Sequence, residues 1–129
     1  MDPDQVRVMV VEDQEMFRSV MRELIAATAG FVLVAEAASS EVALANVRNV
    51  AAEFVIVDAR LSDTDGVQTA VALLDQHPGL VVLLVSVYEL TGTAPVGPTG
   101  QSIPFVRKGD LRTSVLRRIW EERKPALAH

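Results

Sequence analysis

The fold class follows from one stretch near the start of the chain, Arg7-Val8-Met9-Val10-Val11-Glu12-Asp13. Its apolar residues are consecutive rather than alternating, which is typical of a strand buried on both faces of a parallel sheet. Two acids follow the apolar run directly. A parallel sheet with helices on both faces is therefore the first hypothesis, and the acids mark the edge at which polar groups are expected.

The rest of the chain alternates strand-like and helix-like segments. Apolar runs at 31–35, 54–58, 80–85 and 103–106 are predicted to be further strands. Apolar residues recur at helical spacing over 17–25, 67–74 and 115–120, and Ser40 is predicted to cap a helix that reaches about Val50. This alternation predicts parallel strands with right-handed crossovers.

One segment interrupts the alternation. Residues 91–100 hold three glycines and two prolines, a composition that opposes a regular helix. We therefore expect a mobile loop between the last two strands. One domain is predicted over residues 1–124, followed by a disordered tail or the start of a linker at 125–129.

Composition narrows the possible functions. The chain has 129 residues, half of them hydrophobic, and no cysteine, so it can form one compact core without disulfides or thiolate metal sites. It lacks the layout of a signal peptide and an apolar run of about 20 residues, so a soluble cytoplasmic protein is expected.

Charge is unevenly distributed along the chain. A net charge of −5 disfavours direct contact with nucleic acid. The segment 107–124 nevertheless carries seven basic residues against three acids. We interpret these charges as the solvent-exposed face of a helix, and a surface that binds a partner is the alternative.

Chemistry-bearing residues follow the predicted strands. Glu12 and Asp13 follow the first strand, Asp58 and Ser86 lie at the ends of the third and fourth, and Lys108 follows the fifth. Because the carboxyl ends of parallel strands share one edge, these groups are expected to converge. Clustered carboxylates without histidine or cysteine suit Mg²⁺, and Asp58 is a candidate nucleophile that would form an aspartyl phosphate.

The same residues carry a resemblance to the receiver domain of two-component response regulators. The matching pieces are residues 8–13, 55–61 with Asp65-Gly66, 83–86 and 105–108. The spacings also match: 45 residues separate Asp13 from Asp58, 28 separate Asp58 from Ser86, and 22 separate Ser86 from Lys108. The resemblance implies a flavodoxin-like doubly wound sheet of five parallel strands in the order 2-1-3-4-5, here with a degraded fourth helix. A weaker similarity, over 32–37, is to receivers placed ahead of helix-turn-helix domains.

The resemblance also implies roles for individual residues. Asp58 would be the phosphoacceptor, assisted by Lys108. Asp13 and Asp58 would ligate Mg²⁺ together with the backbone carbonyl of Arg60, and Glu12 would act through water. The remaining pair is the hydroxyl and aromatic switch, Ser86 and Phe105.

The implied partners are a sensor histidine kinase or a phosphotransfer protein, a second copy of the chain in a homodimer, and an output domain on the carboxyl-terminal side. No direct contact with nucleic acid or membrane is expected. The chain is not expected to be an enzyme, beyond its own phosphorylation from small phosphodonors and slow dephosphorylation.

Four departures from the family pattern stand out. Ser62 replaces the usual proline, which predicts a less rigid loop after Asp58. Gly109 replaces a proline with a cis bond, which predicts a different arrangement of that loop. Val87 is bulkier than the usual alanine or glycine, and the segment 91–101 replaces a helix that normally belongs to the signalling face.

Three alternatives remain open. A phosphorylation-independent interaction module would keep the site but signal constitutively. A Mg²⁺-dependent phosphatase with an aspartyl intermediate would need an acid where Arg60 stands, and a nucleotide or flavin binder would need a glycine-rich loop after the first strand.

Overall fold

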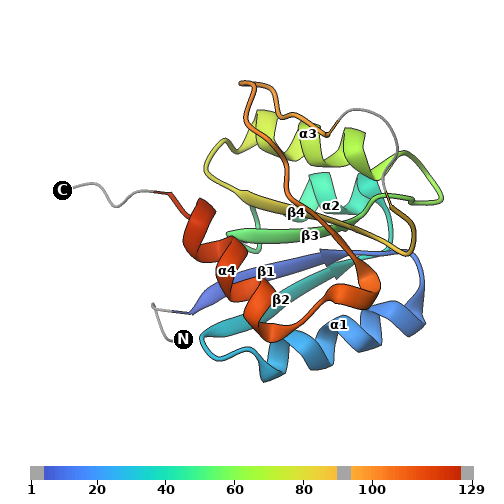
Figure 1. Cartoon of the computed structure of the whole chain (residues 1–129). Helices are drawn as coiled ribbons and strands as arrows, with labels where there is room; N and C mark the ends of the chain where they lie inside the picture. Colours follow the sequence, from blue (N-terminus) through green and yellow to red (C-terminus); the bar gives the residue numbers. More distant parts are fainter. Residues whose placement is uncertain (1–4, 90–93, 126–129) are drawn as a thin grey trace.

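The computed structural model describes residues 5–89 and 94–125, which form a single parallel sheet with helices on both faces (Figure 1). The strands are β1 (Val6–Val11), β2 (Phe31–Ala37), β3 (Phe54–Asp58), β4 (Val81–Ser86) and β5 (Phe105–Arg107). The helices are α1 (Glu15–Ala27), α2 (Ser40–Asn46), α3 (Gly66–Gln76) and α4 (Thr113–Arg123). The sheet order β2-β1-β3-β4-β5 confirms the predicted doubly wound, flavodoxin-like fold.

The two faces of the sheet pack against different helices. In β1, Val8 and Val10 belong to the core that includes Met21 of α1 and Leu116 of α4. The intervening Met9 and Val11 belong to a second core, shared with α2 and α3. Figure 1 shows these two helix pairs on opposite sides of the sheet. Because successive apolar residues of β1, β3 and β4 meet one core and then the other, the apolar runs of these strands are continuous instead of alternating.

The second helix differs from its prediction at both ends. Its N-cap is Ser39, whose side-chain oxygen accepts a hydrogen bond from the Val42 amide, so the prediction of Ser40 was wrong by one residue. The helix ends at Asn46 and not near Val50. Turns continue over residues 47–51, where the Val50 amide donates to the Asn46 carbonyl at 3.1 Å. Ala51, the last residue of these turns, has a φ of 52°, a left-handed conformation.

The crossover from β4 to β5 contains no helix between residues 94 and 104, the part that the structure describes. Val96 forms an antiparallel bridge with Ser102, and the Gly97 amide donates to the carbonyl of Gln101 at 2.7 Å. Gly100, at a φ of 85°, allows this tight turn. The expected loss of the helix between β4 and β5, the fourth in the family pattern, is confirmed for these residues. Residues 91–93 lie outside the described part, and the mobility of the segment stays a prediction.

β5 begins at Phe105, two residues later than predicted, because Pro104 has no amide hydrogen to donate to the sheet. Of the predicted tail, only Pro125 is described, and residues 126–129 lie outside the described residues. Within the described parts of the chain, none of the helices combines the length and apolar character needed to cross a membrane.

Candidate functional site

An acidic cluster lies at the carboxyl edge of the sheet. Glu12 and Asp13 follow β1, and Asp58 is the last residue of β3. Each of these three carboxylates offers one oxygen, and the three oxygens lie within 4.8 Å of one another. Glu12 and Asp58 are buried. The structure therefore brings together the three side chains that the sequence proposed as metal ligands.

Lys108 joins this cluster from the turn after β5. Its Nζ donates to Glu12 Oε1 at 2.6 Å and to Asp58 Oδ2 at 3.0 Å, and its side chain is only 11% exposed. The same ammonium lies 4.0 Å from the centre of the Phe17 ring. A short 3₁₀ turn, Lys108–Asp110, positions the lysine, and there is no cis peptide bond among the described residues. One buried cation thus lies between two buried carboxylates.

The charged groups of the cluster shift the pKa values of one another. The pKa of Glu12 is raised to about 7. Burial is the largest cause and the neighbouring Asp58 carboxylate adds to it, whereas Lys108 acts in the opposite direction. Burial would lower the pKa of Lys108, but its hydrogen bonds to Glu12 and Asp58 outweigh burial and raise it above its ordinary value. Lys108 therefore stays charged at neutral pH, while Glu12 titrates close to neutrality.

Asp13 is held by the loop that follows β3. Its Oδ2 accepts hydrogen bonds from the Ser62 amide at 3.0 Å and from the Ser62 hydroxyl at 2.7 Å. The hydroxyl bond is the main cause that lowers the pKa of Asp13. The loop in which serine replaces the usual proline is therefore tied to the acidic cluster.

The start of this loop is also fixed. The Arg60 amide donates to Asp58 Oδ1 at 2.9 Å, and the Gly66 amide donates to the Ala59 carbonyl at 2.9 Å. A Cβ atom at Gly66 would lie 1.9 Å from the Asp58 carbonyl oxygen, so only glycine allows α3 to begin this close to β3. The preceding Asp65 caps α3 by accepting from the Val67 amide.

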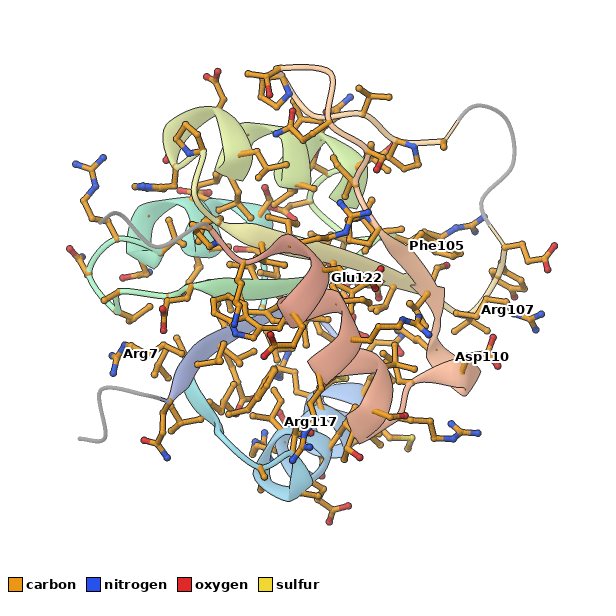
Figure 2. All side chains as sticks on the ribbon, turned by 60° about the vertical axis from the view of Figure 1, so that its left-hand side comes forward. Arg7, Phe105, Arg107, Asp110, Arg117 and Glu122 are labelled. Atoms are coloured by element: carbon orange, nitrogen blue, oxygen red, sulfur yellow. The ribbon has the colours of Figure 1, made fainter. Side chains whose placement is uncertain are left out.

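The predicted switch pair lies on neighbouring strands, with Ser86 the last residue of β4 and Phe105 the first residue of β5. Ser86 is 3% exposed, and its Oγ accepts a hydrogen bond from the Tyr88 amide at 3.3 Å. Phe105 is partly buried and is paired in register with Leu84. Figure 2 shows Phe105 and Arg107 along β5, and Asp110 in the turn that leads to α4.

Two contacts near the site were not predicted from the sequence. Phe17 was assigned only to the buried stripe of its helix, yet its ring lies beside the Lys108 ammonium. The Arg60 guanidinium lies 5.1 Å from the centre of the Tyr88 ring, and this joins the loops after β3 and β4. The sequence gives no clear signal for either contact, because both depend on the conformation of loops.

Most of the basic segment 107–124 does not take part in the site. Some of its exposed side chains form ordinary surface pairs, such as Arg118 with Glu122 at 3.5 Å and Lys124 with Glu121 at 2.9 Å. These pairs agree with the predicted solvated helix face, and such exposed pairs contribute little to stability.

The comparisons with known proteins identify the family. The family model described as the response regulator receiver domain matches residues 8–96. The chain therefore belongs to the receiver domains of two-component response regulators. The matched range ends within the crossover between β4 and β5, so Phe105 and Lys108 lie beyond it.

Curated relatives include response regulators and protein-glutamate methylesterases. The chain is 32% identical over 89 residues to protein-glutamate methylesterase/protein-glutamine glutaminase 1 of Paramagnetospirillum magneticum, across 69% of this chain and 23% of that protein. It is 30% identical over 84 residues to response regulator GacA of Pseudomonas viridiflava, across 65% of this chain and 39% of that protein. The chain thus spans well under half the length of these relatives.

Solved structures agree on the fold. The signal receiver domain of NarL from Mycobacterium tuberculosis superposes with a TM-score of 0.77 at 23% identity, covering 96% of this chain and all of that one. The response regulator domain of Thermotoga maritima CheB gives a TM-score of 0.74 at 16% identity, covering 95% of this chain and 99% of that one. At these identities the similarity establishes the fold alone.

Proposed function

We propose that this receiver domain accepts a phosphoryl group on Asp58 from a phosphohistidine of a sensor kinase or phosphotransfer protein, in a Mg²⁺-dependent reaction in the cytoplasm. The observation that carries the proposal is the placement of Lys108, which donates to both Glu12 and Asp58 at the edge where the acidic cluster lies. A buried lysine between two carboxylates is a costly arrangement for stability alone, and it is well suited to neutralise an incoming phosphate.

The residues present fit a hard divalent cation. Three carboxylate oxygens within 4.8 Å of one another are the type of ligand that Mg²⁺ prefers. Asp13 and Asp58 would hold the ion with the Arg60 carbonyl, and Glu12 would hold it through water. Bound there, the ion would offset negative charge on the transferring group.

In the proposed reaction, a carboxylate oxygen of Asp58 attacks phosphorus. The new O–P bond forms as the P–N bond to the donor histidine breaks, and that nitrogen takes a proton as it leaves. Lys108 then pairs with a phosphoryl oxygen as a point charge. The Ser86 hydroxyl accepts from the Tyr88 amide in the unmodified protein, so its own hydrogen remains available for a second phosphoryl oxygen. Phe105 completes the proposed switch.

The proposed consequence of phosphorylation is a change in partner or output interactions. A homodimer and an output domain on the carboxyl-terminal side are the proposed recipients of the signal. The chain itself is proposed to have no enzymatic activity beyond its own phosphorylation from small donors and slow dephosphorylation.

One observation favours a second candidate. The crossover after β4 forms a short antiparallel turn over 96–102 where the family usually has a helix of the signalling face. A module that has lost this helix could bind its partner without phosphorylation. The phosphatase alternative gains no such support, because Arg60 stands where the second acid would be needed and lies over Tyr88.

Phosphoryl transfer from acetyl phosphate separates these candidates. Wild-type protein, Asp58→Asn and the matched surface control Asp75→Asn are incubated with the donor and Mg²⁺ and measured by intact-mass spectrometry. Wild type and Asp75→Asn are expected to gain one phosphoryl group stably, and Asp58→Asn none. Rapid donor consumption without a modified species would indicate a phosphatase. No modification of the wild type would favour the phosphorylation-independent module.

A further inference from the structure

Ser62 makes two hydrogen bonds to a single carboxylate oxygen. Its amide lies 3.0 Å and its hydroxyl 2.7 Å from Oδ2 of Asp13, a residue 49 positions earlier in the chain. Together these two donors occupy both lone pairs of that oxygen. The Asp13 carboxylate is therefore fixed in plane and direction, with Oδ1 left for another partner.

The loop that carries Ser62 is anchored on both sides of it. Before it, the Arg60 amide is bonded to Asp58 Oδ1. After it, the Asp63 carboxylate accepts from the amides of Ser40 at 3.2 Å and Glu41 at 3.3 Å, at the start of α2. The Ser62 donors are thus delivered to Asp13 by a loop held at three points, although Ser62 itself is exposed to solvent.

We propose that Ser62 is a positioning residue for Asp13 in the cation site. This inference rests on the proposed function, because it assumes that Asp13 ligates Mg²⁺. A partner that donates to a ligating carboxylate fixes its orientation, and loss of such a partner typically costs about 10–100-fold in metal affinity. Proline, the usual residue here, has neither an amide hydrogen nor a hydroxyl. In this chain two hydrogen bonds supply the order that the proline ring would otherwise give.

The hydrogen bonds from Ser62 order the Asp13 carboxylate before a cation binds. Asp13 is only half-buried, so its carboxylate would otherwise rotate freely and would have to be ordered when the cation binds. The bonds from Ser62 make that ordering part of folding.

Magnesium titration of the unmodified protein, followed by backbone amide NMR, tests the proposal without any phosphodonor. Ser62→Ala removes the hydroxyl and keeps the amide, and Ser62→Thr keeps both donors. Thr64→Ala is the matched control, since it removes a hydroxyl from the same loop that contacts Gln68 and not the acidic cluster. Ser62→Ala is expected to weaken Mg²⁺ binding about tenfold, and the other two variants to bind as the wild type does.

A second measurement needs no metal. In Asp13→Ala the Ser62 amide loses its acceptor, so its hydrogen exchange is expected to accelerate strongly while the amides of β1 and β3 stay protected. Three results would overturn the proposal: unchanged or tighter Mg²⁺ binding in Ser62→Ala, equal weakening in Thr64→Ala, or no measurable binding by the wild type. Failure of phosphoryl transfer with these Mg²⁺ affinities intact would contradict the proposed function instead.

Discussion

Replacing Lys108 by methionine gives the most direct test of the buried charge cluster. Methionine keeps the length and the apolar contact with Phe17, but it leaves Glu12 and Asp58 without their shared cation. Removing one partner of a buried ion pair typically costs about 3–5 kcal/mol. With the three side chains at most 11% exposed, little of this is relieved by solvent.

The size of the loss should depend on pH, because Glu12 can take up a proton. Its pKa is about 7 in the folded protein against 4.5 for the free side chain. A raised carboxyl pKa means that the folded state binds more protons, so this group lowers stability as pH rises through the window from 4.5 to about 7. Lys108 opposes the shift, so its removal raises the pKa further and extends the fall above neutrality.

The expected result is a loss of about 3–5 kcal/mol near pH 8.5 in Lys108→Met. Near pH 5.5 the loss should be smaller by at least about 1.4 kcal/mol, the equivalent of one pKa unit. Urea unfolding followed through the single tryptophan, Trp120, gives both values, because its ring stacks on Phe54 in the core at 6.3 Å.

Lys124→Met is the matched control, since it removes an exposed lysine paired with Glu121. It should cost no more than about 0.5 kcal/mol at either pH. An equal loss at both pH values in Lys108→Met, or a loss no larger than in the control, would refute the idea that this lysine holds two buried carboxylates in place.

Three further predictions concern the loops around the site. Gly66→Ala should destabilise the fold by about 3 kcal/mol or more in urea unfolding, because its Cβ would lie 1.9 Å from a backbone oxygen. The control Gly109→Ala should be nearly neutral, because a Cβ there would meet no atom within 4 Å. Asp13→Asn should abolish a weak Mg²⁺ affinity measured by NMR titration, and unchanged affinity would remove this residue as a ligand. Residues 94–101 should exchange most amide hydrogens quickly in the free protein and change their exchange when a phosphoryl mimic is bound, so strong protection in the free state, or identical exchange in both states, would contradict a switching loop.

The sheet and the position of the site were predictable because both follow from one-dimensional patterns. Uninterrupted apolar runs mark strands that are covered on both faces, and the order of strands and helices restricts the connections. Once the strands are parallel, the residues at their carboxyl ends must share an edge. Glu12, Asp58 and Lys108 could therefore be placed together before any distance was known.

The contacts made by loops were not predictable in the same way. Ser62 was expected to loosen its loop, because the sequence shows only that a proline is missing. Its bonds to Asp13 depend on how residues 59–65 fold back toward β1, and no residue pattern encodes that path. The end of α2 was also missed, since turns take the place of a helix over residues 47–51 and Ala51 is left-handed, which the local sequence does not indicate.

On the proposed function, the absence of a helix from the described part of the β4–β5 crossover would change which surface elements respond to phosphorylation of Asp58. The groups closest to its carboxylate are the Arg60 amide and Lys108, and the neighbouring Ser86 is bonded to the Tyr88 amide. Tyr88 is 62% exposed and lies under the Arg60 guanidinium. On the proposed function, a phosphoryl oxygen that accepts from the Ser86 hydroxyl would reorient that hydroxyl, whose oxygen accepts from the Tyr88 amide. Modification of Asp58 would also change the carboxylate that the Arg60 amide contacts. Both changes meet at the contact between Arg60 and Tyr88, which lies on the surface. The loops after β3 and β4 are therefore exposed elements through which the modification would reach the surface.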